Sequence, residues 1–169
     1  MSPSPKHLQR RADIEGAEAV HVSHPLNPRS EIFMKRLSDP TGMSRIGVNL
    51  ARIPPGKESF LPHAHSAQEE WVYVLEGTGT ALIGDEEIAI GPGDFLGFPT
   101  DGTVHHLMNH GDADLVFLQG SERGGVEVGR FPTIGKRLLI LGDGMAHFVP
   151  EDAIESRPLS DWLAKKPEG

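Results

Sequence analysis

Residues 54–77 read PPGKESFLPHAHSAQEEWVYVLEG, and this stretch decides the fold. Its second half, EWVYVLE at 70–76, is rich in β-branched and aromatic residues and predicts a strand. Side chains two apart in an extended chain share a face, so His63 and His65 are expected to point the same way. The short SAQE loop then leads to a new strand at Glu70. If the two strands are antiparallel neighbours, a carboxylate lies beside two imidazoles.

A second histidine pair follows in TVHHLMN, residues 103–109. Because His105 and His106 are adjacent, they face opposite sides of any strand, and only one of them can line an interior. The local pattern alone leaves open which of the two does so.

The remainder of the chain predicts an all-β domain. Glycine (20) and proline (14) together make up about a fifth of the 169 residues, well above the average share, so the chain turns often. Apolar runs recur at the spacing typical of sandwiches and barrels. Besides 70–76, strands are expected at 31–37, 44–53, 78–83, 86–90, 94–98, 103–109 and 113–119, with one or two more beyond Ser121. The Gly84-Asp85 pair sits where a tight hairpin turn is needed.

Both ends of the chain differ from this middle. Residues 1–30 form an expected N-terminal arm, partly disordered or on the outside of the fold, because no apolar period is sustained there. The β-domain is expected at 31–149 and a tail with short helices at 150–169. Pro150 and Ser160 are the helix-starting residues of that tail, and Trp162 is expected to pack on the barrel.

Composition narrows the possible partners. The net charge is -8 and no Lys/Arg-rich stripe runs along the chain, which argues against nucleic acid. No apolar run approaches the length of a membrane span, and the N-terminus lacks the apolar core of a secretory signal, so we expect a cytoplasmic protein that contacts no membrane. The absence of cysteine excludes disulfides and thiolate ligands. Any metal would be held by histidines and carboxylates.

The two histidine segments resemble the two motifs of the cupin superfamily. The first motif is matched by Gly56, six residues, His63-Ala64-His65, four residues, Glu70, six residues and Gly77. The second is matched by Gly93, Pro99, Gly102, His105 and Asn109, with Asp101 as one extra residue between Pro99 and Gly102. The resemblance covers about residues 45–120. The flanking segments are similar to a group of single-domain bacterial cupins to which no reaction is assigned.

The resemblance implies a jelly-roll antiparallel β-barrel that binds one divalent transition metal through His63, His65, Glu70 and His105. Three imidazoles and one carboxylate suit Fe, Mn, Ni, Cu or Zn, and leave open positions on a six-coordinate ion. Glu69 is the alternative to Glu70, but only Glu70 shares a face with the apolar Val72 and Val74. The interval to Asn109 favours His105, which would leave His106 outward or behind the site.

Further expectations concern the surroundings of the site. An apolar pocket is expected from Phe60, Phe98, Leu107 and Phe117, and surface or loop positions are expected for His7, His21, His24, His110 and His147. Arg52 is expected on the outer face, because an interior arginine needs an anionic partner. The position of Gln119 is left open. Tyr73 is expected to face outward, which argues against chemistry that uses a His and Tyr pair.

The function expected from these features is a metalloenzyme that acts on a small anionic or oxygen-rich metabolite, of isomerase, hydrolase or dioxygenase type. The alternative is a module that binds or senses a small ligand without turnover. A structural role for the terminal segments is a third possibility. The exposed strand edges also make a homodimer a reasonable expectation.

Overall fold

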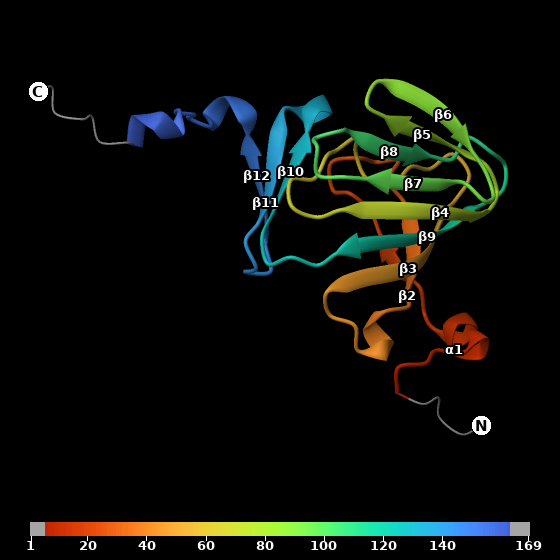
Figure 1. The fold of residues 1–169 in the computed structure, drawn as a ribbon. Coiled ribbons are helices and arrows are strands. Elements are labelled where there is room, and N and C mark those ends of the chain that lie inside the picture. Colours follow the sequence, from red (N-terminus) through yellow and green to blue (C-terminus); the bar gives the residue numbers. More distant parts are fainter. Residues whose placement is uncertain (1–5, 163–169) are drawn as a thin grey trace, which may run out of the picture.

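The structure is a computed structural model, and it describes residues 6–162. Three antiparallel sheets make up most of it (Figure 1). The six-stranded sheet has the order β1-β2-β3-β9-β4-β7, with β1 Val20–Val22, β2 Ile32–Arg36, β3 Ile46–Ile53, β9 Leu115–Glu122, β4 Glu70–Glu76 and β7 Phe95–Phe98. The second sheet has the order β6-β5-β8, with β6 Glu86–Ile90, β5 Gly79–Ile83 and β8 His105–Met108. The third has the order β10-β11-β12, with β10 Glu127–Phe131, β11 Lys136–Ile140 and β12 Ala146–Pro150.

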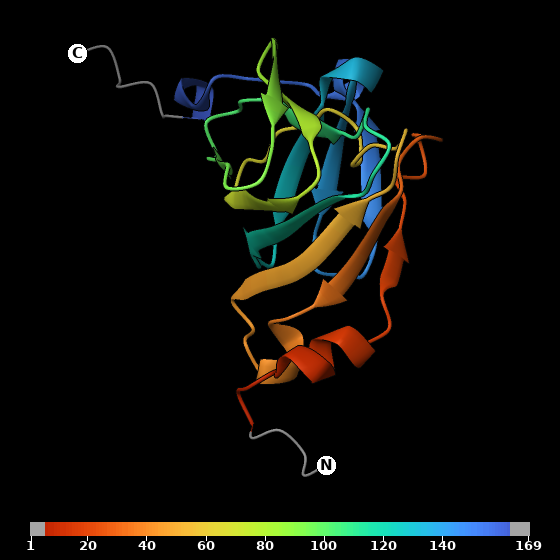
Figure 2. The ribbon, with the colours of Figure 1, turned by 90° about the vertical axis from the view of Figure 1, so that its right-hand side faces the viewer.

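The few helices are short. They are α1 Arg11–Gly16 and the 3₁₀ helices η1 Asp39–Thr41, η2 Pro132–Ile134, η3 Glu151–Ala153 and η4 Leu159–Trp162. Figure 2 shows α1 and η1 beyond the end of β2 and β3, away from the remaining strands. Within residues 6–162 no helix has both the length and the apolar character that crossing a membrane requires. The all-β prediction with a jelly-roll architecture is therefore confirmed, although the sheets remain separate rather than joined into one continuous barrel.

The histidine-pair segment links the second and third sheets. His63 forms a single bridge with His105 of β8, and Ala64 forms one with Arg130 of β10. The backbone bonds are reciprocal in both bridges, with N–O distances of 3.1 and 2.8 Å for the first pair. The segment is thus extended, as expected, but held by isolated bridges rather than a full strand ladder. Through these bridges the strands β10 to β12 lie beside the end of the six-stranded sheet at which β9 finishes (Figure 1).

Alternation along the strands builds the core. Val72 and Val74 are buried, whereas Tyr73 between them is 40% exposed, so the expected parity of β4 is confirmed. The core cluster consists of Ile32, Ala51, Ile53, Val72, Val74, Ala81, Ile90, Leu96, Phe98, Leu107, Leu115 and Phe117. Burial of each large side chain stabilises the fold by about 1.5–3 kcal/mol before the entropy of ordering is counted. The hairpin expected at Gly84 is present, and its φ of 62° is one that glycine adopts without strain.

The N-terminal segment is more structured than expected. It contributes α1, and β1 extends the six-stranded sheet by pairing Val20 with Met34. His24, expected on the surface or in a loop, is 9% exposed. Its ring lies 5.3 Å from that of Phe131 and 5.8 Å from that of Phe148, measured between centroids. His24 is therefore in a loop, one of the two expected positions, but it is buried because β10 and β12 supply aromatic partners that no local pattern reveals.

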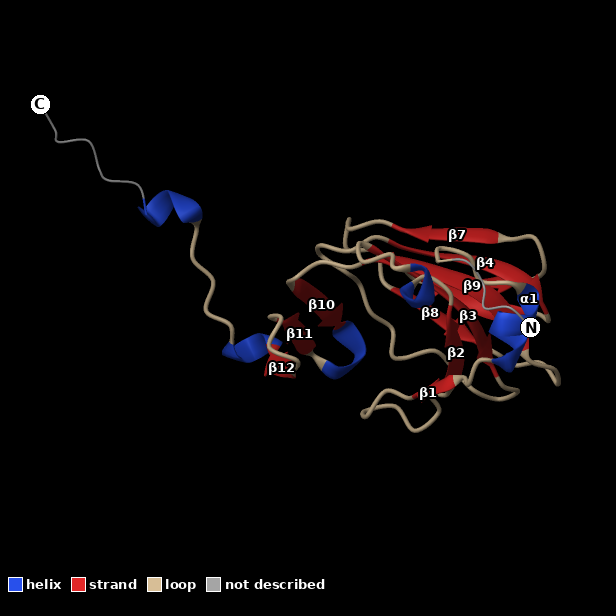
Figure 3. Cartoon of the chain, turned by 90° about the horizontal axis from the view of Figure 1, so that it is seen from below, coloured by secondary structure: helices blue, strands red, loops and turns tan. Residues whose placement is uncertain are grey.

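The C-terminal part also departs from expectation. Three strands follow Ser121 instead of one or two, because the glycine turns at Gly135 and Gly142 divide the segment into two hairpins. The short helices expected in the tail are present as 3₁₀ turns, η3 directly after Pro150 and η4 around Ser160, and residues 163–169 lie outside the described part. Trp162 is 82% exposed, so its expected packing on the barrel is wrong. Figure 3 shows that η4, a turn of four residues, stands well apart from the sheets. It therefore has no apolar surface to pack against.

Candidate metal centre

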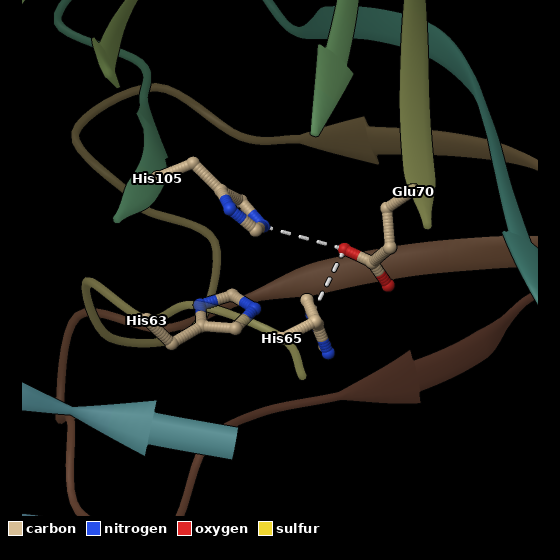
Figure 4. A group of neighbouring side chains, drawn as sticks. All are labelled: His63, His65, Glu70 and His105. Carbon is tan, nitrogen blue, oxygen red and sulfur yellow. Dashed lines mark ion pairs between the residues drawn. The ribbon is translucent and has the colours of Figure 1, made fainter. Parts of the chain in front are cut away.

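Three segments bring four side chains together at one end of the sheets. Glu70 opens β4, His105 opens β8, and His63 and His65 come from the bridging segment between the sheets. One potential ligand atom from each lies within 4.8 Å of the others. Figure 4 shows the carboxylate of Glu70 facing the rings of His65 and His105. Its Oε2 lies 3.3 Å from Nε2 of His65 and 3.4 Å from Nε2 of His105.

The alternatives at neighbouring positions fall elsewhere. Glu69 is exposed and lies outside the group, and its backbone N–H donates to Glu122. His106 is buried on the opposite side of β8 from His105. The four residues that the structure brings together are therefore the four that the sequence motifs indicate.

His63 is held in a single orientation and tautomer. Its Nδ1 lies 2.7 Å from the carbonyl oxygen of Leu61, which can only accept, so Nδ1 carries the proton. This leaves the Nε2 lone pair free to face the group. Burial, followed by the neighbouring imidazoles of His105 and His65, lowers the pKa of His63 to about 3. His63 is consequently a neutral imidazole at neutral pH, which is the form that binds metals.

The charges of Glu70 and His65 are coupled. Burial alone would raise the pKa of Glu70, but the contacts with His105 and His65 outweigh it and hold that pKa well below its ordinary range. Burial alone would lower the pKa of His65, and the carboxylates of Glu70 and Glu127 outweigh it and raise that pKa. The Glu70 carboxylate is therefore ionised and able to act as an anionic ligand.

The donor set has free capacity for a cation. Both ring nitrogens of His65 and of His105 are buried without a hydrogen-bond partner among residues 6–162. Nε2 of each ring lies at ion-pair distance from Glu70, but neither contact has the geometry of a hydrogen bond. A buried polar group left without a partner costs about 1–3 kcal/mol, and natural proteins rarely keep several together. Three imidazoles and one carboxylate suit a divalent transition metal, so these residues fit the cofactor that the cupin resemblance implies.

Glu127 on β10 supports the group from behind, and the sequence analysis missed it. Its side chain is 2% exposed, and its carboxylate accepts hydrogen bonds from the backbone N–H groups of Ser66 (2.8 Å) and Ala67 (3.2 Å). Oε1 also lies 3.7 Å from Nδ1 of His65. Carboxylates placed behind a histidine orient the ring toward a metal. No local signal marks Glu127, because its position depends on the bridge between Ala64 and Arg130.

A second buried network lies behind His105. Nε2 of His106 faces Oε2 of Glu58 at 3.3 Å, and Nδ1 of His106 lies 3.0 Å from Oγ of Ser59. Since the carboxylate only accepts, Nε2 carries the proton and the Ser59 hydroxyl donates to Nδ1. Arg29 and Asn27 from the N-terminal segment also bind Glu58. The expected position of His106 behind the site is thus observed, and the N-terminal segment takes part in supporting it.

Two other residues from the sequence analysis are structural. Asn109 is fully buried, and its side-chain amide donates to the carbonyl oxygens of Ile53 and Ala113, both at 2.8 Å. Arg52 lies on the outer face, as expected, where it pairs with Asp114 at 3.0 Å.

A small cavity adjoins the group. It is lined by Ile32, Ser59, Phe60, His63, Glu70, Val72, Phe98, His105, Leu107, Phe117 and Gln119. All four apolar residues expected for a pocket are in this lining. The ring of Phe98 stacks on that of His105 with centroids 3.9 Å apart. The space open to the centres of water molecules is about 30 Å³, enough for one or two waters.

The fold and the His/Glu group define a class of protein. The cupin domain family matches residues 49–119, the part of the chain that contains all four residues of the group. Two solved structures resemble the chain over most of its length. One is a provisionally assigned sugar phosphate isomerase from Acidithiobacillus ferrooxidans, with 35% identity, a TM-score of 0.86, and coverage of 90% of this chain and 97% of that one.

The other is a sugar phosphate isomerase of the cupin superfamily from Silicibacter pomeroyi, with 30% identity, a TM-score of 0.72, and coverage of 80% and 87%. The chain belongs to the cupin superfamily. A curated relative, an uncharacterized protein from Methanocaldococcus jannaschii, is 34% identical over 68 residues. That match covers 40% of this chain and 53% of the relative, so the chain spans about half the length of this relative.

Proposed function

We propose that this cupin is a metal-dependent isomerase of a small, oxygen-rich, anionic metabolite, with one divalent transition ion held by His63, His65, Glu70 and His105. The observation that carries the proposal is the convergence of these side chains, four of whose buried ring nitrogens have no hydrogen-bond partner in the described part of the chain. A divalent ion with one carboxylate and three neutral imidazoles forms a positive centre. Such a centre favours an anionic substrate even though the whole chain carries -8.

The reaction class is supported by the two long solved matches. Both are described as sugar phosphate isomerases, the first provisionally, and they cover 90% and 80% of this chain. Moving a carbonyl between neighbouring carbons of a sugar through an enediol takes one proton from carbon to carbon and another from the hydroxyl oxygen to the former carbonyl oxygen. When bound, a divalent ion supplies Lewis-acid polarisation of the neighbouring carbonyl and hydroxyl oxygens.

The residues of the chain would supply the other requirements. Glu70 is the only carboxylate in the cavity lining, and its lowered pKa suits it to hold the ion rather than to take up the migrating proton. Ser59 and Gln119 are the polar lining residues outside the His/Glu group, and Gln119 can donate to and accept from a sugar hydroxyl. The apolar wall limits access of water. Tyr73, the only tyrosine, lies on the outer face and takes no part.

The test is turnover by protein purified without chelator and loaded separately with Mn, Fe(II), Ni and Zn. Aldose and ketose phosphates would be screened by NMR for exchange of the C2 proton and for product. We expect metal-dependent conversion of at least one compound, lost in His63→Ala and kept in His110→Ala, which removes an exposed histidine outside the group. Saturable binding without conversion under any metal would replace this proposal by the binding-module alternative.

A further inference from the structure

An arginine cluster lies at the same end of the six-stranded sheet as the His/Glu group. Ser121 of β9 pairs with Gly47 of β3 on one side and with Glu70 of β4 on the other. Three arginines stand at or just beyond the strand ends there: Arg36 closes β2, Arg45 precedes β3, and Arg123 follows β9. The backbone N–H of Arg123 donates to the carbonyl oxygen of Arg45 at 2.9 Å, which keeps the last two together.

The side chain of Arg123 folds across the inner side of β3. Gly47 belongs to the inward-facing set of this strand, with the buried Ala51 and Ile53. A Cβ at Gly47 would stand 3.0 Å from Nε and 3.3 Å from Nη2 of Arg123, so the guanidinium lies against the bare backbone of the glycine. A side chain at position 47 would force the guanidinium to shift. Because Glu70 is on the same face of the sheet, the guanidinium and the His/Glu group lie on the same side.

Charged groups of both signs stand at this end. The Asp39 carboxylate binds both Arg123 and Arg36, and Ser38 also accepts from Arg123. Arg45 is exposed and forms no ion pair within residues 6–162. The carboxylate of Glu122, which lines the same hollow as Arg45 and Arg123, accepts from the backbone N–H of Glu69. Arg45 is thus the arginine of this cluster whose charge no carboxylate pairs within residues 6–162.

The cluster borders a surface hollow large enough for a ligand group. The hollow has a volume of about 420 Å³ and is lined by Arg45, Ile46, Ala67, Glu122, Arg123 and Gly124. Ala67 belongs to the loop that follows His65, so the hollow adjoins the segment that carries the histidine pair. Two arginines, Arg45 and Arg123, contribute to the same concave surface.

We propose that Arg45 and Arg123 form a subsite for the phosphate group of the substrate, placed beside the His/Glu group by the pairing of β3, β9 and β4. This proposal rests on the proposed function and adds the chemical class of the substrate's far end. Neighbouring strands lie about 4.8 Å apart, so Gly47 and Glu70, two strands apart, are separated by ~10 Å. A ligand with a single carboxylate group cannot contact both places at once. A phosphorylated sugar can, with its carbonyl end at the His/Glu group and its phosphate at the arginines.

Guanidinium groups suit a phosphate in particular. Arginine presents a planar fork of donors that matches phosphate oxygens in pairs, and it stays charged at all accessible pH values. Asp39 and Ser38 both accept from Nη2 of Arg123 and so restrict where the guanidinium lies. The position of Arg123 is therefore set before a ligand arrives, which lowers the entropy lost on binding.

The experiment measures binding to the full chain by calorimetry at low salt, with metal content determined for every sample. The probes are inorganic phosphate, glucose 6-phosphate and glucose. We expect one phosphate site per chain, tighter binding of glucose 6-phosphate than of glucose, and a loss of phosphate affinity of about tenfold or more in Arg123→Ala and Arg45→Ala. Arg11→Ala, on the exposed face of α1, is the matched control and should bind as wild type.

Gly47→Ala tests the same subsite without removing charge. The added methyl group would push the guanidinium away, so phosphate affinity should fall while metal content and folding are retained. Phosphate binding unchanged in Arg45→Ala, Arg123→Ala and Gly47→Ala would overturn the subsite. His63→Ala separates the two proposals: phosphate affinity should persist there although metal is lost. Loss of phosphate binding in His63→Ala alone would mean that the anion binds at the His/Glu group and not at the arginines.

Discussion

Glu127→Gln removes one negative charge behind the candidate metal centre while keeping the size of the side chain. In the native protein both carboxylate oxygens accept a backbone N–H, from Ser66 and Ala67, and Oε1 also faces His65. An amide has one acceptor oxygen, so one of the two N–H groups would meet an amide nitrogen instead. A buried donor left unpaired costs about 1–3 kcal/mol, and we expect the free energy of unfolding to fall by that amount.

The effect on metal binding should be larger than the stability change alone explains. Loss of a carboxylate behind a ligating histidine lowers metal affinity about 10–100-fold. The assay is Zn²⁺ titration against a chromophoric chelator, together with urea unfolding of the metal-free protein. Glu122→Gln is the matched control, because its carboxylate also accepts a backbone N–H but does not contact the His/Glu group. Equal metal affinity in the Glu127→Gln variant and wild type would refute the supporting role of this residue.

Three further outcomes follow from the same geometry. Glu70→Gln should sharply reduce the metal retained on gel filtration, and Glu69→Gln should not; equal losses would contradict the parity assignment. In metal-free protein the pKa of His63 is about 3 in the folded state and 6.5 in the unfolded state, so between these values only the unfolded chain gains this proton. The free energy of unfolding should therefore fall as the pH is lowered from 6.5 toward 4, and urea unfolding should show a smaller fall in His63→Gln. Gly120→Ala should cost about 1–3 kcal/mol by overpacking, because its Cβ would stand 2.1 Å from the Trp71 indole, and an unchanged thermal midpoint would be inconsistent with that contact.

Strand parity was sufficient to predict much of the site. The alternation of apolar residues from Val72 to Val74 places Glu70 inward and Glu69 outside the group, as the structure has them. The identity of the inward histidine in the second pair could not be obtained from alternation, because His105 and His106 are both buried on opposite sides of β8. The interval to Asn109 in the cupin motif made that choice.

Contacts between distant segments account for what was missed. Glu127 reaches the site only because β10 bridges to Ala64, and Arg123 reaches the inner face only because Gly47 leaves room for it. Neither of these two contacts produces a repeating pattern of apolar and polar residues in the sequence. The N-terminal segment looked like an arm because β1 is three residues long and its partners lie in β2. The packing expected for Trp162 was wrong because this residue lies in the short η4 turn, where its side chain is exposed instead of packing against the sheets.

The most direct test of the metal centre is elemental analysis of wild-type protein purified without chelator, alongside His65→Ala and the His110→Ala control. We predict about one equivalent of a single divalent transition metal per chain in wild type and in His110→Ala. We predict little or none in His65→Ala, together with a lower thermal midpoint, because a bound ion stabilises the folded state by mass action. Wild-type protein that carries no metal, and whose stability does not respond to added Mn, Fe, Ni or Zn, would contradict the assignment.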